Sequence, residues 1–496
     1  MDTGRIRKYP RLSRNLDVDV VVVGGGITGI TAAYLLSKAG ATVALLERDS
    51  FAAADTGHTT AHLTYVTDER FSDLVQGLGR DHAQAVWDAG RAAISKIDEI
   101  IREEAIPCEF AWVPGYLHSP VGKTGPGNVF KLEKDAELAA EMGFDAEFVE
   151  GVPFVRKPGV RFANQAKFHP RKYAAGVLAA LPRKGCHVFE RSEVEEIKAE
   201  PLSVKANGHV IKGTNVILAT HVPLQGIAGA VSAALFQTKI FPYTSYALGA
   251  RIPQGVVPEA SFWDTGDPYD YMRVDRRKDH DYVVYGGADH KTGQVRDPCG
   301  HYERLEKRLL RLVPEAVIDH RWSGQVIETS DGLPFMGETA PMQYVATGFS
   351  GNGMTFGTLG AMMACDAVTG RLNPWQELFD VKRKMVRRGA WDYLKENKDY
   401  PYYFIKDRLA SPAEKTLRGI KRGEGKIVQK DGRKIAAFRD ANGKLSTKSA
   451  VCTHMGCIVR WNGADQTWDC PCHGSRFQAT GEVIGGPAET PLEDVK

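Results

Sequence analysis

Two short groups of cysteine and histidine near the C-terminus have the spacing of metal ligands. Residues 452–454 read Cys-Thr-His, residues 470–473 read Cys-Pro-Cys-His, and fifteen residues separate the first histidine from the second group. Two thiolates and two imidazoles on two loops suit a tetrahedral zinc ion. They also suit a [2Fe-2S] cluster in which two histidines replace two cysteines on one iron.

A glycine-rich turn near the N-terminus has the spacing of a dinucleotide-binding site. Gly24, Gly26 and Gly29 follow a β-branched run at 19–23 and open a helical pattern. The first glycine permits a tight turn, the second lets the backbone approach a pyrophosphate, and the third lets helix and strand pack closely. Glu47, 18 residues after the third glycine, ends the next apolar run, where a carboxylate can bind ribose hydroxyls. The motif predicts a dinucleotide but leaves NAD and FAD open.

The elements that would position this turn form a strand–turn–helix–strand unit. We expect buried strands at 19–23 and 41–46 with a helix at 30–38 between them, because continuous apolar runs typify parallel strands. Apolar periodicity then predicts helix within 68–106. Residues 236–290 are richer in aromatic residues, proline and glycine, which favours an antiparallel sheet.

The composition is that of a globular protein. Of the 496 residues, 43% are hydrophobic and 25% are charged, which excludes a wholly disordered or fibrous protein. No apolar run reaches the ~18 residues of a membrane span, and residues 1–15 lack the apolar core of a secretory signal. The formal net charge of +3 gives no reason to expect nucleic acid or a membrane as partner. We therefore expect a cytoplasmic protein.

Basic residues concentrate in one segment between two differently composed regions. Residues 381–430 hold 15 lysines and arginines against 6 acids, whereas residues 431–496 hold 8 of each kind. We interpret 376–424 as a basic helix and linker, followed by a domain of short strands with turn signals. The basic segment could dock an acidic electron carrier such as a ferredoxin or flavodoxin, and a solvated helix face is the plainer alternative.

Three further segments resemble the D-amino-acid-oxidase-like flavoproteins, a family that includes glycine oxidase and sarcosine oxidase. Residues 54–61 resemble its small-residue pyrophosphate and flavin loop, and residues 331–337 resemble its late DGLP segment. Residues 346–354 resemble its glycine turn, whose following helix directs its N-terminus at the flavin ring. The resemblance covers about residues 17–375 and implies FAD. Together with the glycine motif, it predicts that FAD is bound by Gly24, Gly26, Ile27, Thr28, Gly29, Glu47, Arg48, Thr56, Thr59, Thr60, Val194, Ala219, Thr220, Gly348, Gly351, Asn352, Gly353, Met354 and Thr355.

The implied fold is an α/β Rossmann-like FAD-binding domain interleaved with a substrate domain on an antiparallel sheet, plus a small all-β C-terminal domain. We expect the oxidoreductase module at residues 1–375, the linker at 376–424 and the C-terminal domain at 425–496. Within the module, the FAD-binding parts are about 17–70, 150–225 and 325–375, and the substrate parts are about 70–150 and 225–325.

The substrate side departs from the family pattern. Glycine and D-amino-acid oxidases carry an arginine before the DGLP segment that pairs with the substrate carboxylate, and Val326 stands at that position here. Arg273 is the nearest replacement, with a structural ion pair as its alternative role. Tyr271 and Tyr246 are further candidates for the catalytic site, although aromatic residues on a sheet more often belong to the core.

Two histidines, His58 and His62, stand four residues apart in the flavin-loop segment. On a helix this spacing would suit a metal. The resemblance instead favours histidines that line the cofactor site, with covalent attachment of the flavin to one of them as an alternative.

The C-terminal metal group resembles a respiratory-type Rieske domain. Cys457 and Cys472 occupy matching places in the two ligand loops, and in such domains this pair forms a disulfide that clips the loops over the cluster. The resemblance implies that Cys452 and Cys470 bind one iron and that His454 and His473 bind the other. Residues 485–488 resemble the third, proline-containing loop of these domains.

Two positions near the second ligand loop bear on the reduction potential of a Rieske cluster. Ser475 matches a hydroxyl that hydrogen-bonds a cluster sulfur in respiratory examples. Phe477 stands where a tyrosine is usual and donates no hydrogen bond. Because a lost donor lowers the potential, we expect a value below that of the quinol-oxidising proteins.

Two such cofactors in one chain imply an electron-transfer enzyme. A flavin takes two electrons as a hydride and a Rieske cluster takes one, so electrons would pass from substrate to FAD, to the cluster and to an external acceptor. The sequence allows the reverse direction as well. From the family we expect a dehydrogenase that oxidises a C–N bond of a small amine or N-substituted amino acid. The alternatives are a 2-hydroxy-acid dehydrogenase and a redox relay or sensor without small-molecule turnover.

Overall fold

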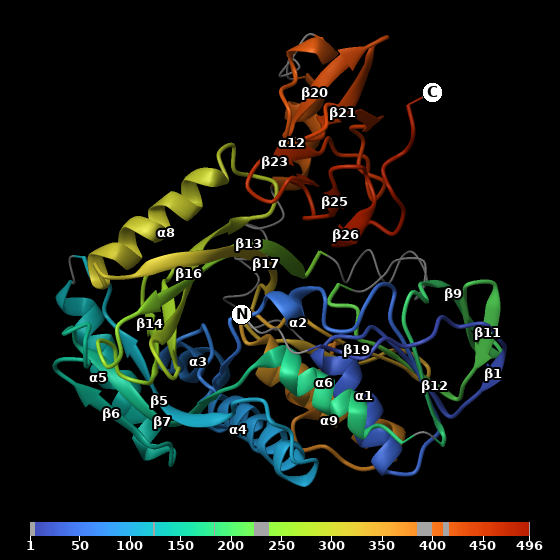
Figure 1. Cartoon of the computed structure of the whole chain (residues 1–496). Helices are drawn as coiled ribbons and strands as arrows, with labels where there is room; N and C mark the ends of the chain where they lie inside the picture. The colour runs from blue at the N-terminus through green and yellow to red at the C-terminus, as the bar shows by residue number, and fades with distance from the viewer. Residues whose placement is uncertain are drawn as a thin grey trace.

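The computed structural model describes residues 5–122, 125–182, 184–222, 238–383, 399–409 and 416–495. Figure 1 shows a broad body formed by the first part of the chain and a small C-terminal domain, coloured orange to red, that stands on it. The small domain rests on the side of the body where β13 (Ile240–Ile252) and β17 (Val317–Thr329) lie.

The predicted dinucleotide-binding unit belongs to a six-stranded, mainly parallel sheet. Neighbouring strands run parallel except for one antiparallel pair at the β18 edge. Every residue of β2 and β3 is buried, which explains their continuous apolar sequences. In spatial order the strands are β18 (Phe335–Ala340), β19 (Gln343–Thr347), β12 (Asn215–Leu218), β2 (Val20–Val23), β3 (Val43–Leu46) and β8 (Cys186–Phe189).

Three helices pack together beside this sheet. Helix α1 (Ile27–Lys38) contacts both α9 (Gly353–Val368) and α6 (Pro170–Ala180), and Figure 1 shows all three gathered at the base of the body. Helix α1 begins three residues earlier than the predicted range, because Gly26 of the glycine turn already caps it. Most of α9 is buried, so the helix that follows the second glycine turn is part of the core.

A four-stranded sheet packs on one face of the parallel sheet, opposite the face that the helices cover. It shares a hydrophobic core with β2, β3 and β12. Its strands, in spatial order, are β1 (Leu16–Asp17), β11 (His209–Lys212), β10 (Leu202–Ala206) and β9 (Val194–Ala199).

The predicted substrate domain is built on a nine-stranded sheet. Its strand pairs are antiparallel, as predicted, except that β5 and β14 run parallel. In spatial order the strands are β17, β13, β16 (Asp281–Lys291), β15 (Tyr271–Arg276), β14 (Ser261–Asp264), β5 (Ala111–His118), β7 (Gly159–Lys167) and β4 (His62–Leu63), with β6 (Ala146–Val149) beside β7.

Helices flank this sheet. Helix α8 (Cys299–Leu312) packs on β13 and β16, and Figure 1 shows it lying along the outer side of these strands. The predicted helical stretch 68–106 is two helices, α3 (Phe71–Leu78) and α4 (Arg80–Glu103). They are separated at Gly79, whose φ of +85° is left-handed and ends the first helix. Helix α5 (Pro126–Glu141) packs on α3 and β7.

The C-terminal domain consists of two small antiparallel sheets, the first of which begins at Glu424. Trp468 and Phe477 are fully buried at its centre. One sheet holds β20 (Glu424–Lys430), β21 (Arg433–Arg439) and β22 (Leu445–Ser449), and the other holds β23 (Arg460–Asn462), β24 (Thr467–Asp469), β25 (Arg476–Gln478) and β26 (Val483–Gly485).

The predicted basic linker is described in part. It contains α10 (Gln376–Phe379), α12 (Asp399–Leu409) and the short 3-10 helix Leu417–Gly419. Residues 384–398 and 410–415, with several of its basic side chains, lie outside the described residues. Among the helices of the described ranges, none has the length and apolar character needed to cross a bilayer. The cytoplasmic location stays a prediction.

Candidate functional site

The glycine turn after β2 has the tight geometry that its motif predicts. Gly24 has a φ of +109°, and a Cβ atom on it would overlap the main-chain oxygen of Ala219. A Cβ atom on Gly29 would overlap the main-chain oxygen of Gly24. Gly26 caps α1, so the helix N-terminus faces the turn. This glycine-only backbone beside a helix N-terminus fits the pyrophosphate of a dinucleotide.

The loop after β3 packs against the same turn. In α2 (Asp55–His58), the Thr56 Oγ1 atom accepts a hydrogen bond from the Ile27 N–H at 3.0 Å. Thr28 is buried on the side of α1 that meets α9, where Gly357 leaves room for its side chain. The flavin-loop segment and the glycine motif are therefore in contact, as the resemblance implies.

Glu47 ends β3 next to the glycine turn. Its Oε2 atom accepts the Gly25 N–H at 2.7 Å, and its Oε1 atom accepts the Asp49 N–H at 2.8 Å. Burial raises the pKa of this carboxyl group. Arg48 points elsewhere, because its Nη2 atom donates to the main-chain oxygen of Ile484 in the C-terminal domain at 2.8 Å.

The other residues predicted to bind the dinucleotide near the first glycine turn lie on or beside neighbouring strands. Ala219 follows β12 and donates its N–H to Val23 at 2.8 Å, and Thr220 comes next along the chain. Val194 begins β9, two residues after Ser192, whose N–H bonds the main-chain oxygen of Glu47 at 2.8 Å. These contacts bring Ala219, Thr220 and the start of β9 to the end of the sheet where the glycine turn lies.

A second glycine turn leads into α9. Gly348 and Gly351 have φ values of +74° and +75°, and Gly353 and Met354 open the helix. The side chain of Asn352 donates to the Val66 oxygen at 3.2 Å. One turn later, the Thr355 hydroxyl donates to the Thr64 oxygen at 2.9 Å. These two bonds fix the N-terminus of α9 against the chain that follows the flavin-loop segment.

The flavin-loop segment ends in β4. Thr59 Oγ1 accepts the Ala61 N–H at 3.0 Å, and Thr60 Oγ1 lies 3.2 Å from His62 Nδ1. Burial, and next the charge of Arg273, lower the pKa of His62 to about 4, so this imidazole is neutral. Helix α2 ends at His58, so the two histidines do not share a helix.

Tyr271 on β15 faces the flavin-loop segment. Its hydroxyl lies 3.0 Å from Ser245 Oγ, and its ring meets His62 edge to face with centroids 5.6 Å apart. The Thr60 hydroxyl also hydrogen-bonds it. Tyr271 therefore touches the predicted FAD-binding loop, as a residue of the catalytic site must.

Arg273 lies two residues further along β15, and the loop itself holds its guanidinium. Nη1 donates to the main-chain oxygens of Ala61 at 2.8 Å and Phe168 at 3.0 Å. Nη2 pairs with Asp275 at 3.1 Å. Asp275, on the same strand, therefore balances the charge of Arg273. A role of Arg273 in substrate binding stays a prediction.

Tyr246 lies on the opposite face of the sheet. It is fully buried with the hydrophobic residues beneath α8, its hydroxyl bonds His290 at 2.9 Å and its ring stacks on His301. The pairing of β13 with β16 shifts register between Thr244 and Tyr246, where the strand is irregular. The structure thus assigns Tyr246 to the core under α8, away from Tyr271.

Two carboxyl groups that no sequence motif marks lie near Tyr271. The hydroxyl of Tyr269 donates to Asp68 Oδ1 at 3.2 Å, and the rings of Tyr269 and Tyr271 are 5.8 Å apart. Asp68 remains accessible to water, yet the protein atoms that crowd it raise its pKa to about 7. A Cβ atom on Gly351 would lie 3.2 Å from Asp68 Oδ2, so this carboxyl group adjoins the second glycine turn.

Asp289 is the second carboxyl group, and Ser245 hydrogen-bonds both Asp289 and Tyr271. Burial raises the pKa of Asp289 to about 7, although a hydrogen bond from Ser245 opposes the shift. Within the described part of the chain, its Oδ1 atom is buried and has no hydrogen-bond partner. Its charge raises the pKa values of Tyr271 and Asp68. We call Asp68, Asp289, Tyr269, Tyr271 and Ser245 the acidic cluster.

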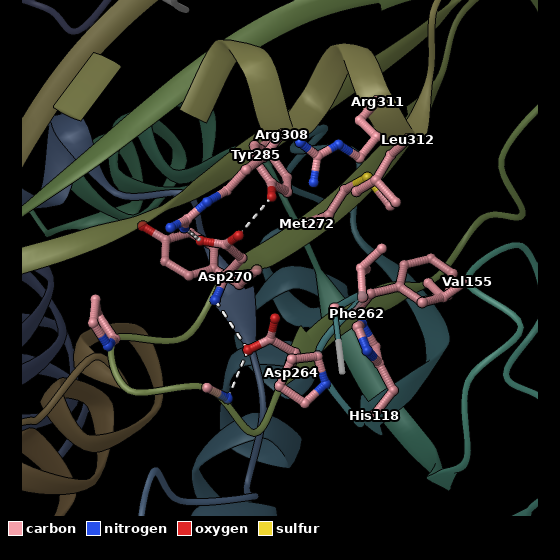
Figure 2. Close-up of a pocket in the computed structure, with 16 residues that line it drawn as sticks. His118, Val155, Phe262, Asp264, Asp270, Met272, Tyr285, Arg308, Arg311 and Leu312 are labelled. Atoms are coloured by element: carbon pink, nitrogen blue, oxygen red, sulfur yellow. Dashed lines mark hydrogen bonds and ion pairs between the residues drawn. The ribbon is translucent and has the colours of Figure 1, made fainter. Parts of the chain in front are cut away.

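A cavity of about 220 Å³ opens on the α8 side of the sheet. Figure 2 shows Asp270 in its wall, where Tyr285 donates to Oδ2 at 2.8 Å and Arg308 to Oδ1 at 2.6 Å. Phe262 and Met272 add apolar surface. Asp270 is thus fully paired, and the two apolar residues belong to the core beneath α8 rather than to the predicted flavin face.

The four predicted metal ligands converge in the C-terminal domain. The thiols of Cys452 and Cys470 hydrogen-bond each other, and the rings of His454 and His473 lie 4.9 Å apart, edge to face. A cluster with two cysteines on one iron and two histidines on the other needs the two thiols next to each other and the two imidazoles next to each other. The donor set therefore fits the predicted [2Fe-2S] centre.

The two ligand loops are clipped together beside these ligands. Cys457 and Cys472 form a disulfide, with Cα atoms 6.5 Å apart, which confirms the predicted pair. Their Sγ atoms lie within 4.8 Å of the Cys470 thiol. Ser475 is fully buried, hydrogen-bonds Cys452 and accepts the Ala488 N–H at 3.1 Å, so the third loop closes over the same centre.

Gln325 joins the C-terminal domain to the flavin-loop segment. Its side-chain Nε2 atom donates to the main-chain oxygen of Gly474, next to the ligand His473, at 2.8 Å. Its own N–H donates to Asp55 Oδ1 in α2 at 3.0 Å. One buried residue of β17 therefore touches both the cluster loop and the loop that packs on the dinucleotide turn.

The rest of this interface is close-packed. Gln294 donates to the Pro471 oxygen at 3.0 Å, and Ser323 to Asp465 at 2.6 Å. A Cβ atom on Gly293 would lie 2.7 Å from the carbonyl carbon of Cys470, so a larger residue there would push the cluster loop away. Neither Gln325 nor Gly293 belongs to a motif, and the interface could not be located from the sequence.

Two protein-family models match separate parts of the chain. Residues 19–367 match the family described as FAD dependent oxidoreductase, and residues 413–496 match the Rieske [2Fe-2S] domain.

Individual proteins resemble either the whole chain or one of its parts. YhfW of Bacillus subtilis strain 168, whose name describes a Rieske 2Fe-2S iron-sulfur protein, is 32% identical over 494 residues, covering 98% of this chain and 95% of its own. The cytochrome b6-f complex iron-sulfur subunit of Chlorobaculum thiosulfatiphilum is 45% identical over 74 residues, which are 15% of this chain and 40% of that one. The crystal structure of glycine oxidase from Geobacillus kaustophilus superposes with a TM-score of 0.62 at 17% identity, over 75% of this chain and 100% of that one, and shows the shared fold.

Proposed function

Because the chain belongs to the FAD-dependent oxidoreductase family and carries a C-terminal Rieske [2Fe-2S] domain, we propose that it oxidises a small amine and delivers the electrons through its own cluster. The substrate would be an amine or an N-substituted amino acid, oxidised at a C–N bond. Electrons would leave the Rieske domain for an acceptor outside the chain.

The observation that carries this proposal is the contact of the cluster loop with the oxidoreductase module. Gln325 bonds Gly474 of the cluster loop through its side chain and Asp55 of α2 through its main chain. Gly293 permits close approach of Cys470, and Arg48 bonds Ile484. The second ligand loop is therefore held against the strands next to the predicted flavin site, which suits direct transfer within one chain.

The protein residues have separate tasks in this scheme. The bound FAD supplies hydride acceptance and the cluster supplies one-electron transfer. The glycine turn and the N-terminus of α1 hold the dinucleotide phosphates, and the N-terminus of α9 favours negative charge at the flavin. Tyr271 and Ser245 present hydroxyls on the substrate side. The neutral His62 adds an aromatic edge to the same face.

The choice of an amine rests on likeness to other proteins of this fold. Similar solved structures include a glycine oxidase, an L-proline dehydrogenase and an L-amino acid deaminase. Each of these names a nitrogen-bearing substrate. A 2-hydroxy acid is less well supported, because the ion-paired Arg273 leaves no anchoring arginine that we can identify among the described residues.

An acidic carrier protein, such as a ferredoxin or flavodoxin, remains our proposal for the external acceptor. Its support is the basic segment 381–430, which precedes and enters the Rieske domain. Opposite charges on carrier and docking segment would speed their encounter at low ionic strength.

The test is an anaerobic titration of the holoprotein with amines, N-methyl amino acids and 2-hydroxy acids, followed by absorbance. We expect loss of the flavin bands and then loss of the cluster bands with one class of amine. A Cys452→Ser variant, which lacks one cluster ligand, should lose flavin absorbance with the same substrate and show no second phase. Failure of every compound to reduce the flavin would contradict the dehydrogenase and favour a relay or sensor.

A further inference from the structure

The acidic cluster lies between the two segments that are expected to hold the flavin. Tyr271 reaches Thr60 of the flavin-loop segment, and Asp68 adjoins Gly351 of the second glycine turn. With FAD bound by these segments as the family resemblance implies, the first glycine turn would hold the phosphates, and residues at this position would lie toward the ring end of the cofactor. The side chains of the cluster are therefore placed to meet the substrate.

The charges at this place are negative. The charge of Asp289 raises the pKa of Asp68, and it also raises the pKa values of Tyr269 and Tyr271. One carboxylate oxygen, Asp289 Oδ1, is buried without a hydrogen-bond partner in the described part of the protein. A buried acceptor left unsatisfied is costly unless a ligand completes it.

Among the described residues, the cations that could bind a substrate carboxylate are engaged or replaced. The family's arginine position is Val326. Arg273 donates to two main-chain oxygens and pairs with Asp275. His62 is neutral. In this part of the chain, the substrate side therefore offers acceptors for a positive charge, and the arginine–carboxylate pair that would recognise an amino acid is not formed there.

We propose that the acidic cluster binds the cationic nitrogen of the substrate through Asp68 and Asp289, and that the enzyme selects amines that lack a carboxylate. This inference rests on the proposed function. It narrows the proposed substrates from amines and N-substituted amino acids to cationic amines that carry no carboxylate. Tyr269 hydrogen-bonds Asp68, and Ser245 hydrogen-bonds Asp289. These two bonds orient the carboxyl groups toward the bound cation.

Recognition can be measured apart from turnover with two inert quaternary ammonium compounds. Tetramethylammonium and trimethylglycine carry the same fixed cation and differ by one carboxylate, and neither has a nitrogen lone pair to support oxidation. Their binding to the flavin-loaded protein is followed by perturbation of the flavin spectrum and by calorimetry. We expect tetramethylammonium to bind at least about tenfold more tightly than trimethylglycine, the ratio that one unfavourable charge contact produces.

The variants Asp68→Asn and Asp289→Asn, made separately, remove one negative charge each with little change of shape. Each should weaken tetramethylammonium binding by about tenfold and leave the flavin content unchanged. Asp279→Asn, an exposed position between β15 and β16 of the same sheet, is the matched control and should bind as the parent does. Two independent variants keep the test decisive if one of them fails to load FAD.

Reduction by pyrrolidine and proline separates failure of the inference from failure of the function. These compounds also differ by one carboxylate. Faster flavin reduction by pyrrolidine supports both proposals. The inference is overturned if proline reduces the flavin as fast as pyrrolidine or faster, and if trimethylglycine binds as tightly as tetramethylammonium. That result would still support amine oxidation. The proposed amine oxidation is overturned if neither pyrrolidine nor proline reduces the flavin while the Asp68 and Asp289 variants still weaken tetramethylammonium binding. That result would still support cation recognition by the acidic cluster.

Discussion

The side chain of Gln325 donates a hydrogen bond to the main-chain oxygen of Gly474 at 2.8 Å, across 149 residues of sequence. The bond joins β17 of the FAD-binding half to the loop that carries the cluster ligands Cys470 and His473. Gln325 is buried, so this contact is shielded from water. It makes the position of the cluster loop depend on a strand of the oxidoreductase module.

Replacement of this side chain should uncouple the two cofactors. In Gln325→Leu the Gly474 oxygen loses its donor, which costs about 1–3 kcal/mol at a buried site and loosens the cluster loop. We expect flavin reduction by substrate at the parental rate and reduction of the cluster slowed several-fold, measured by anaerobic stopped-flow absorbance. Gln254→Leu, which removes an amide bonded far from the interface, is the control. An unchanged cluster phase in Gln325→Leu would show that this contact does not govern transfer.

The disulfide between Cys457 and Cys472 should stabilise the Rieske domain selectively. It closes a loop with a sequence separation of 15, for which chain entropy gives about 3 kcal/mol. A Cys457→Ser and Cys472→Ser double variant should therefore lose its cluster absorbance at a lower temperature than the parent, with the flavin transition unmoved. Treatment of the parent with a reductant should give the same shift. Identical melting of the cluster in both proteins would contradict a structural role for the bond.

The Ser475 hydroxyl should raise the reduction potential of the cluster. It is buried and hydrogen-bonds the Cys452 thiol, one of the two sulfur ligands. A donor to ligand sulfur stabilises the reduced state. Its removal in Ser475→Ala should lower the potential by about 40 mV, the one-electron equivalent of a hydrogen bond of about 1 kcal/mol. Redox titration followed by circular dichroism or electron paramagnetic resonance measures this, with Ser446→Ala on β22 as control.

The metal ligands and the dinucleotide turn could be predicted from the sequence because each is local. A few residues of fixed spacing, such as Gly24 to Gly29, already determine the backbone that a phosphate needs. The paired loops of the cluster lie close enough in sequence for their matching cysteines to be recognised. The structure confirms the convergence of the four ligands and the disulfide.

The substrate side could not be predicted in the same way, because its residues meet only through tertiary structure. Asp68 and Tyr269 are bonded across 201 residues, and nothing in their local sequences marks them. The face on which Tyr246 lies depends on a register shift in β13, and a β-bulge of this kind has no clear signal in one sequence. The role of Gln325 likewise appears only when the two domains are placed together.

Cation binding by the acidic cluster should depend on pH near neutrality. The pKa values of Asp68 and Asp289 are raised to about 7, because the protein atoms around each carboxyl group disfavour its charged form, so both groups take up protons as the pH falls through that value. Of the other groups that act on them, Glu69 adds negative charge beside Asp68, and Asp270 has a raised pKa and is paired with Arg308. His62 has its pKa lowered to about 4, and the pKa values of Tyr269 and Tyr271 are raised. We therefore assign a change of charge between about pH 6 and about pH 8 to Asp68 and Asp289, whose pKa values lie in that range.

The sign of the effect follows from the charged form that binds. Tetramethylammonium keeps its charge at every pH, and it is attracted by the ionised carboxylates, so its affinity should rise as the pH is raised from about 6 to about 8. In the Asp68→Asn, Asp289→Asn double variant the affinity should be low and flat over this range, while Asp279→Asn should keep the parental slope. Calorimetric titrations at several pH values supply the curves. An affinity that is independent of pH in the parent, or a slope that survives in the double variant, would show that other groups bind the cation.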